Sequence, residues 1–280
     1  MAPEKAEKNN FEKQEVTTLK IKNLDISYRL VKGDAKRTFL FLNGFVSGLV
    51  SFEAVAENLG KYGSVVSVEL PGSGFSSGRE KGSEYSLQEQ TLLLKQVIEK
   101  LSLENLIILG HSMGGAIAVA FAQTYPLLLQ SLILESPAIF PLFLTAFMRS
   151  NFGKIFSFTL LEPIINASSK KIQQQYLVRA QTRVNLKEAL LATLRQRAWG
   201  KIFYYLLAAE GNRDLFKIKV PTLVISGGKD RGIFPGLSRK TLQTLPNSEF
   251  VLLPTCGHIP HEENVLLFTN TVISFLQKQP

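Results

Sequence analysis

The 280-residue sequence is poor in several residue types that mark particular classes of protein. Its one cysteine, Cys256, excludes an internal disulfide and is compatible with a reducing compartment. It has three histidines, and no His/Cys/Asp cluster has the spacing of metal ligands, so we expect no metal and no cofactor. No run approaches the ~18 uninterrupted apolar residues of a membrane span. The sequence therefore favours neither a disulfide scaffold, a metal centre nor a membrane-spanning protein.

The positive charge is unevenly distributed. The formal net charge is +9, and residues 136–215 carry 11 Lys or Arg against 4 Asp or Glu, an excess of +7. No module interleaves these basic residues with exposed aromatics, so we expect no nucleic-acid partner. Solvated helix faces explain this excess of positive charge most simply. Peripheral contact of a basic face of the insertion with an anionic membrane is the alternative. Residues 1–15 mix both charge signs without an apolar stretch, which predicts a solvated tail and favours the cytoplasm.

The chain is organised around residues 105–123, NLIILGHSMGGAIAVAFAQ. A short apolar run predicts a buried strand, an Ala-rich segment predicts a helix, and Ser112 lies at the corner between them. A serine on so tight a turn takes a strained backbone conformation, and side chains at positions 110 and 114 would collide with strand and helix. The N–H of Met113 then lies at a helix N-terminus, where it can bind a developing oxyanion.

Short apolar runs alternate with helix-length segments on both sides of this corner. Residues 38–42, 64–70, 131–135, 221–226 and 249–253 predict buried strands, and residues 16–22 and 25–31 predict edge strands. Between residues 138 and 213 the alternation stops. We therefore predict an α/β fold, a mostly parallel sheet flanked by helices, with a tail (1–15), a core (16–137 and 214–280) and an inserted helical lid (138–213).

A serine nucleophile needs two partners. A base must take its proton, and a carboxylate must hold the tautomer of that base. His111 adjoins Ser112 and is expected to point away from the bend, whereas His258 follows a strand end. The carboxylates that follow strand ends are Asp230 and Glu135.

The corner resembles the G-x-S-x-G nucleophile elbow of the α/β-hydrolases. The order Ser112, Asp230, His258 and the flanks G-x-x-D before a proline and G-H-x-P-x-x-E are similar to that family as well. The resemblance implies that Ser112 is the nucleophile, His258 the general base and then acid, and Asp230 the orienting acid, with Glu135 as the alternative acid. His261 is expected to cap the last helix or to face solvent.

Two further loops are similar to those of the family. Asn43 and Gly44 stand where the family commonly has His-Gly, and the resemblance implies that the N–H of Phe45 is the second oxyanion donor beside Met113. Asn43 replaces the usual histidine and can also hydrogen-bond locally. Glu69 precedes a P-G-S-G loop, and we interpret its role as structural.

The insertion is rich in phenylalanine, which either packs it onto the core or forms an apolar wall; Phe140, Phe143 and Phe147 are candidate substrate-binding residues. No site for a charged substrate is evident, so the resemblance implies an apolar carboxylic ester substrate, as in monoacylglycerol lipases and carboxylesterases. One alternative is a carbon–carbon bond hydrolase of ring-cleavage products, although those tend to carry Trp soon after the catalytic His, where this chain has Ile259-Pro260. Another is a low-turnover ligand receptor on the same fold.

Overall fold

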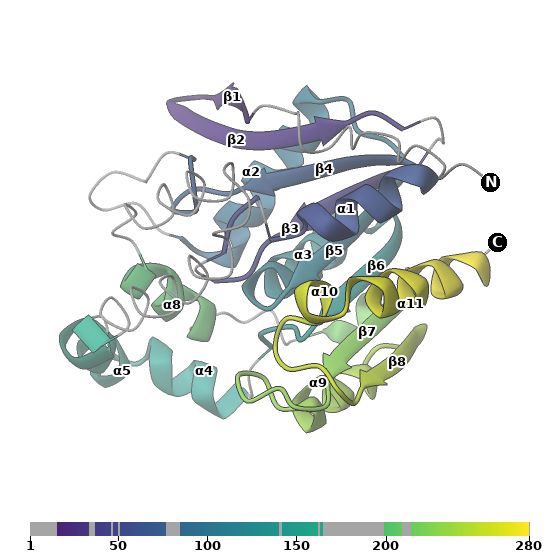
Figure 1. Ribbon diagram of the computed structural model, residues 1–280. Helices are drawn as coiled ribbons and strands as arrows, with labels where there is room; N and C mark the ends of the chain where they lie inside the picture. The colour runs from purple at the N-terminus through teal and green to yellow at the C-terminus, as the bar shows by residue number, and fades with distance from the viewer. Residues whose placement is uncertain are drawn as a thin grey trace, which may run out of the picture.

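The computed structural model describes residues 16–33, 37–45, 47–49, 51–76, 85–139, 142–161, 163–164, 199–208 and 214–279. Within them, eight strands form one sheet in the order β1-β2-β4-β3-β5-β6-β7-β8 (Figure 1). The strands are β1 (Thr17–Ile21), β2 (Leu24–Val31), β3 (Thr38–Leu42), β4 (Ser64–Glu69), β5 (Leu106–His111), β6 (Leu129–Glu135), β7 (Thr222–Gly227) and β8 (Ser248–Leu253). Strands β3 to β8 run parallel, and β1 and β2 are antiparallel to their neighbours, which confirms the predicted mostly parallel sheet.

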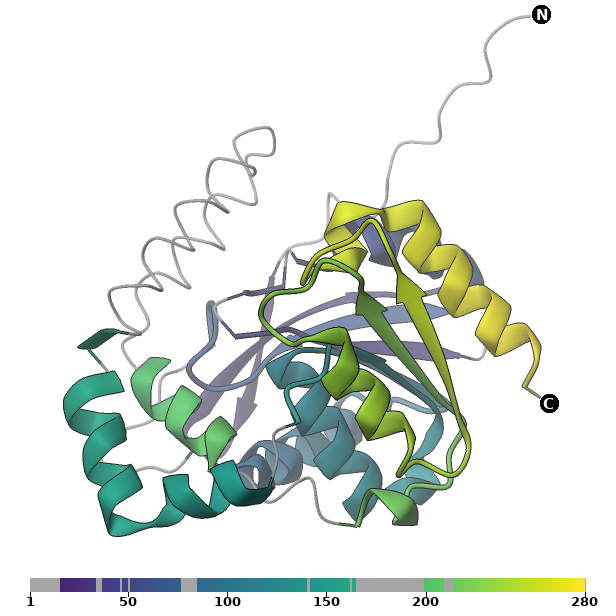
Figure 2. The ribbon, with the colours of Figure 1, turned by 90° about the horizontal axis from the view of Figure 1, so that it is seen from below.

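Helices cover both faces of this sheet (Figures 1 and 2). The helices are α1 (Glu53–Leu59), α2 (Leu87–Lys100), α3 (Met113–Thr124), α4 (Leu142–Arg149), α5 (Asn151–Phe156), α8 (Trp199–Leu207), α9 (Pro235–Leu242), α10 (Pro260–Glu263) and α11 (Val265–Gln277). Short 3-10 helices are η1 (Gly60–Tyr62), η2 (Pro126–Leu128) and η4 (Leu215–Lys217), and η3 (Ser157–Leu161) is π-helical.

Side chains on β3 show how the core is divided between the two faces. Phe39 and Phe41 pack with α1 and α11, whereas Leu40 and Leu42 pack with α2 and α3. Successive side chains of a strand point to opposite faces, so a continuously apolar strand fits a sheet that is covered on both sides. Cys256, 2% exposed, packs in the same cluster as Phe39.

The order of the parallel strands positions the candidate site, because loops that follow parallel strands meet at one edge of the sheet. The loop after β3 begins with Asn43, Ser112 follows β5, Asp230 follows β7 and His258 follows β8. Helices α4, α5 and α8 come from the insertion between β6 and β7, and Figures 1 and 2 place them together at one side of the sheet. Residues 1–15 and 165–198, which include most of the basic residues of the insertion, lie outside the described residues.

Two helix boundaries, at Ser86 and Asn264, differ in how far the local sequence indicates them. Ser86 Oγ accepts a hydrogen bond from the Glu89 N–H (3.3 Å) and caps α2, as the S-x-x-E spacing of these residues indicates. The apolar pattern from Glu262 to Gln277 suits one continuous helix, but the segment forms two, because Asn264 leaves the helical conformation (φ −147°, ψ 77°). The Asn264 side chain accepts a hydrogen bond from the Leu267 N–H (3.2 Å) and so starts α11.

Candidate active site

Ser112 occupies a sharp corner between β5 and α3. Its backbone has φ 51° and ψ −111°, and residues other than glycine rarely adopt a positive φ. The Ser112 N–H donates to the Glu135 carbonyl (2.9 Å), and the Ser112 carbonyl accepts from the Ala138 N–H (2.9 Å). The neighbours must be small, because a Cβ on Gly114 would collide with the Leu42 carbonyl oxygen. The strained conformation expected of this serine is therefore present and held by its surroundings.

Asp230 and His258 form a hydrogen-bonded pair beyond the ends of β7 and β8. Asp230 Oδ2 lies 2.9 Å from His258 Nδ1, and Asp230 Oδ1 accepts the N–H groups of Gly232 (2.8 Å) and Ile233 (2.9 Å). The Asp230 side chain is fully buried, whereas 32% of the His258 side chain is exposed. A fixed carboxylate thus orients the imidazole from inside and leaves its other side open to a reactant.

The electrostatics of this pair suit a base that becomes positively charged. Burial raises the pKa of the Asp230 carboxyl, but the interactions with His258, together with the hydrogen bond from Ile233 and the neighbouring Ser136 hydroxyl, outweigh burial and hold the pKa below its ordinary value. Asp230 is therefore ionised at neutral pH. An ionised carboxylate stabilises the imidazolium that forms when His258 takes a proton.

Ser112 lies next to the loop that carries His258. His111, which precedes Ser112, has its Nε2 3.0 Å from the His258 carbonyl oxygen, and the two imidazole rings are 4.9 Å apart. No hydrogen bond joins Ser112 Oγ to His258 in the described part of the chain; such contacts are often long until substrate binds. The structure thus joins Asp230 to His258 directly and brings Ser112 to the same loop.

The loop after β3 also reaches the serine corner. Asn43 Nδ2 donates to two carbonyl groups of its own loop (2.8 and 3.0 Å) and so shapes the turn. A Cβ on Gly44 would lie 3.3 Å from Ser112 Cβ, which places this loop directly beside the serine. Phe45 follows Gly44, and Met113 begins α3, where the first N–H groups have no partner within the helix. The two expected N–H donors thus come from segments that flank Ser112.

Glu69, at the end of β4, holds the neighbouring loop together. Its carboxyl oxygens accept the N–H groups of Leu49 (3.0 Å) and Phe75 (2.7 Å). The side chain is fully buried, and burial raises its pKa to about 7. These contacts fit the structural role that the sequence indicated for Glu69.

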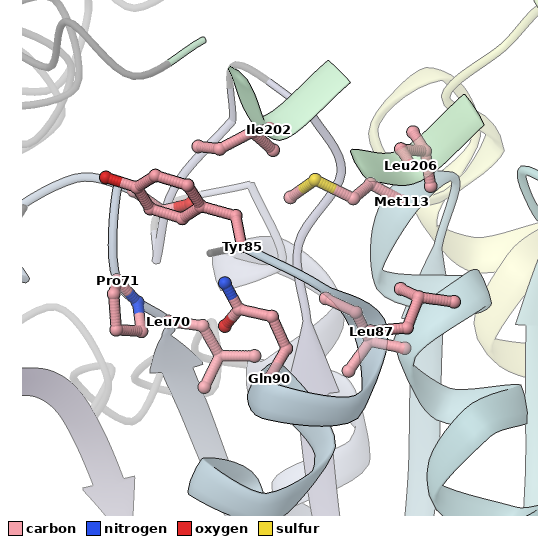
Figure 3. A pocket seen from close by; sticks show the side chains of 10 residues that line it. Leu70, Pro71, Tyr85, Leu87, Gln90, Met113, Ile202 and Leu206 are labelled. Carbon is pink, nitrogen blue, oxygen red and sulfur yellow. The ribbon is translucent and has the colours of Figure 1, made fainter. Parts of the chain in front are cut away.

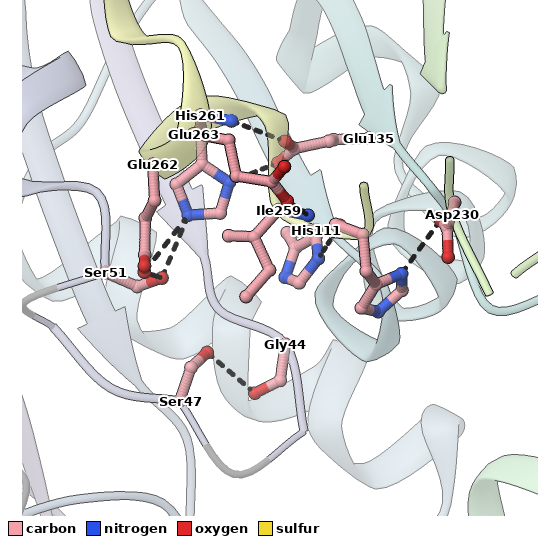
Figure 4. Close-up of polar contacts among 11 residues, drawn as sticks. Gly44, Ser47, Ser51, His111, Glu135, Asp230, Ile259, His261, Glu262 and Glu263 are labelled. Carbon is pink, nitrogen blue, oxygen red and sulfur yellow. Dashed lines mark hydrogen bonds and ion pairs between the residues drawn. The ribbon is translucent and has the colours of Figure 1, made fainter. Parts of the chain in front are cut away.

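Glu135 pairs with His261 and not with His258. Its Oε1 accepts the backbone N–H of His261 (2.8 Å), and its Oε2 lies 2.5 Å from His261 Nδ1 (Figure 4). His261 Nε2 is 2.9 Å from Ser51 Oγ, which donates to Glu262 (2.6 Å). The expectation that His261 caps a helix or faces solvent is wrong: its side chain is fully buried, because α10 turns it back towards β6. Between the two acids left open by the sequence, Asp230 is the one bonded to His258.

Protons in this buried chain can be placed from its hydrogen bonds. Burial raises the pKa of Glu135 to about 7 and lowers that of His261 to about 4, so both shifts favour the neutral forms. A protonated Glu135 donates to His261 Nδ1, the Nε2–H donates to Ser51, and the Ser51 hydroxyl donates to Glu262. Burial also lowers the pKa of His111 to about 3. Burial therefore favours the neutral imidazole for both His111 and His261.

A pocket lies beside the serine corner (Figure 3). Its lining residues are Leu70, Pro71, Ser73, Tyr85, Leu87, Gln90, Met113, Ile117, Ile202 and Leu206. All but Ser73, Tyr85 and Gln90 have apolar side chains. Ile202 and Leu206 come from α8, so the inserted segment forms part of the wall. Sequence reasoning missed these residues except Met113, although Ile202 and Leu206 have the i, i+4 spacing that puts side chains on one helix face.

The phenylalanines proposed as a substrate wall do not line this pocket where the structure describes them. Phe140 lies outside the described residues, as does the side chain of Phe143, whose backbone belongs to α4. Phe147 is 42% exposed, and its ring lies 6.0 Å from that of Phe152 and 6.3 Å from that of Phe156. Phe147 thus contacts other side chains of the insertion.

Metal sites and membrane-spanning helices are both absent from the described residues. No group of three or more His, Cys, Asp or Glu side chains there is arranged to hold a metal ion. Among the helices of the same residues, none combines the length and apolar character needed to cross a membrane.

Comparison with protein families agrees with this geometry. The model of the α/β-hydrolase fold family matches residues 37–265, most of the chain. The chain therefore belongs to this family, as its serine corner and the order of its candidate residues implied.

Individual relatives differ in the reactions their names describe. The chain is 28% identical over 244 residues to Lipase 3 of Moraxella sp. (strain TA144), covering 81% of this chain and 73% of that protein. It is 30% identical over 273 residues to a 2-hydroxy-6-oxononadienedioate/2-hydroxy-6-oxononatrienedioate hydrolase of Cupriavidus pinatubonensis, covering 91% and 93%. A thermophilic esterase from Thermogutta terrifontis has a similar fold, with a TM-score of 0.73 and 21% identity over 95% of this chain and 98% of that one.

Proposed function

We propose that this protein is a serine hydrolase that cleaves a carboxylic ester with an apolar acyl or aromatic group. The observation that carries the proposal is that a strained serine corner and a carboxylate-oriented, partly exposed histidine share one edge of the sheet. Relatives named as lipases support an ester substrate. The mostly apolar pocket beside Met113 supports an apolar one.

The proposed reaction passes through an acyl-enzyme. His258 takes the proton of Ser112 as the hydroxyl attacks the ester carbonyl, and Asp230 keeps the other imidazole proton on Nδ1. The N–H groups of Met113 and Phe45 hold the oxyanion, and each such donor contributes on the order of 10²–10³ in rate. The alcohol leaves with the proton from His258, and water activated by the same imidazole then releases the acid.

The proposal is tested by the hydrolysis of p-nitrophenyl esters from acetate to palmitate. We expect turnover with a chain-length optimum in the wild type and its loss in Ser112→Ala. Ser67→Ala is the matched control, because the Ser67 hydroxyl is buried on β4 without a partner among the described residues. A fluorophosphonate should label the wild type and Ser67→Ala once, at Ser112. Activity that survives Ser112→Ala would refute the assignment, and a one-equivalent burst that stalls would favour the low-turnover receptor.

A carbon–carbon bond hydrolase is the second candidate, since relatives such as the Cupriavidus pinatubonensis protein are named for dienedioate substrates. A dienedioate has two carboxylates, and a buried charge needs a partner. None of the ten side chains that line the described pocket is basic, which favours the ester. Comparing kcat/KM for 2-hydroxy-6-oxononadienedioate and for the best p-nitrophenyl ester decides between them.

A further inference from the structure

Gln90 places an amide in the wall of the mostly apolar pocket. It lies on α2, the residue is only 6% exposed, and its Oε1 has no hydrogen-bond partner among the described residues. A buried amide oxygen is rarely left unpaired in native proteins, so the Gln90 amide, which lines this pocket, has hydrogen-bonding capacity left for a ligand. Figure 3 shows the Gln90 amide directed into the space below the Tyr85 ring, beside Leu70.

We propose that the Gln90 amide binds a hydroxyl group of the substrate, so that the preferred ester carries a hydroxyl near its scissile bond. This inference rests on the proposed function. An amide offers one donor side and one acceptor side, and a hydroxyl both donates and accepts, so the two match in either orientation of the amide. A charged group fits less well, because no Lys or Arg is among the described residues that line the pocket.

The position and size of the pocket limit what it binds. Met113 follows Ser112 directly and Ile117 is one turn further along α3, so the pocket begins beside the nucleophile. The cavity volume is about 20 Å³, which is enough for one or two water-sized groups. A short hydroxylated group fits this space, whereas a long acyl chain requires Ile202 and Leu206 of α8 to move.

Two isosteric ester pairs test the inference. Methyl 3-hydroxybutyrate and methyl 3-methylbutyrate exchange a hydroxyl for a methyl on the acyl side; 2-hydroxyethyl butyrate and propyl butyrate do so on the alcohol side. For one of these pairs we expect the wild type to prefer the hydroxyl ester about 3- to 10-fold in kcat/KM, as one neutral hydrogen bond provides. Gln90→Met should abolish or reverse this preference. Gln88→Met, the same substitution at an exposed position of α2, should preserve it.

Binding to Ser112→Ala separates this inference from the proposed function. The dissociation constants of the same esters, measured by NMR titration with and without Gln90→Met, do not depend on turnover. A Gln90-dependent hydroxyl preference in binding without any wild-type hydrolysis would sustain the inference and reject the esterase. Hydrolysis with hydroxyl-to-methyl ratios that agree within twofold between wild type and Gln90→Met, for both pairs and in binding, would overturn the inference and leave the esterase intact. Gln90→Leu provides the second variant if Gln90→Met does not fold.

Discussion

Replacing Glu135 by glutamine distinguishes two states of the buried Glu135–His261 pair. In the neutral state a protonated carboxyl donates to His261 Nδ1 and accepts the His261 backbone N–H, and a glutamine amide supplies the same donor and acceptor. In the ionised state a carboxylate faces an imidazolium, and glutamine would leave that cation without a counter-charge in a site closed to solvent. The two states therefore predict opposite effects of one substitution.

The neutral state predicts a difference that depends on pH. A rise in the pKa of Glu135 from 4.5 to about 7 means that the folded state favours the protonated over the ionised carboxyl by about 3 kcal/mol more than the unfolded state does. Because the folded-state pKa is raised, the contribution of the protonated Glu135 to the free energy of unfolding is fully present below pH 4.5 and is lost as the pH rises through 7. Glutamine does not titrate, so between pH 5 and 8 the free energy of unfolding of Glu135→Gln should rise by about 2–3 kcal/mol relative to that of the wild type.

Urea denaturation followed by circular dichroism at several pH values measures this difference. Glu249→Gln is the matched control, because Glu249 is 41% exposed and paired with Lys278 at the surface, where ion pairs contribute little. It should show a small effect without the same trend. If Glu135→Gln is less stable than the wild type by several kcal/mol from pH 6 to 8, the pair is ionised and the reasoning from burial is refuted.

Three other substitutions test the remaining parts of the site. Asp230→Asn should lower kcat for ester hydrolysis by about 10³–10⁴-fold, because the His258 tautomer is no longer fixed. The melting temperature should change by only a few degrees, since an amide oxygen still accepts the Gly232 and Ile233 N–H groups. An unchanged kcat would exclude Asp230 as the acid. Gly114→Ala should lower the free energy of unfolding, measured by urea denaturation, by more than about 2 kcal/mol, because its Cβ meets the Leu42 carbonyl. Gly236→Ala has no neighbouring atom within 4 Å of its Cβ and should raise the free energy of unfolding by about 0.5–1 kcal/mol. Equal effects of the two substitutions would contradict this packing. Asn43→Ala should lower kcat/KM about 10-fold with little effect on KM, because it removes two hydrogen bonds that shape the loop before Phe45. A change confined to KM would argue against an oxyanion role for this loop.

The parts of the site that could be predicted from the sequence are those that depend on local geometry. Glycines at fixed distances from Ser112 are required by atoms of the adjoining strand and helix, so the corner can be recognised from a few residues. The position of Asp230 and His258 needed only one more rule, that loops after parallel strands share an edge of the sheet. Ser86 and Glu89 likewise mark a helix start through contacts within four residues.

What the sequence did not reveal depends on contacts between distant segments. His261 is three residues from His258, and nothing local indicates that α10 turns it towards Glu135, which is 126 residues away. The break at Asn264 is decided by this packing and by a side-chain cap, in a segment whose apolar pattern suits one continuous helix. Gln90 belongs to an ordinary amphipathic helix, and only the approach of α8 and the loop after β4 makes it part of a pocket wall.

The two histidine–carboxylate pairs divide the work of the site between them. The backbone around His258 is held by Glu263, which accepts the N–H groups of Gly257 (2.7 Å) and Ile259 (3.1 Å), and by His111, which contacts the His258 carbonyl. With the backbone fixed on both sides, the His258 ring is held in its orientation, and part of its side chain stays open to solvent. Burial favours the neutral forms of His111 and His261, so in the proposed reaction we expect the positive charge on His258, where the Asp230 carboxylate is placed to stabilise it. We therefore expect the buried Glu135–His261 pair to hold the backbone of this loop in place, and the Asp230–His258 pair to undergo the change of charge that the proposed reaction requires.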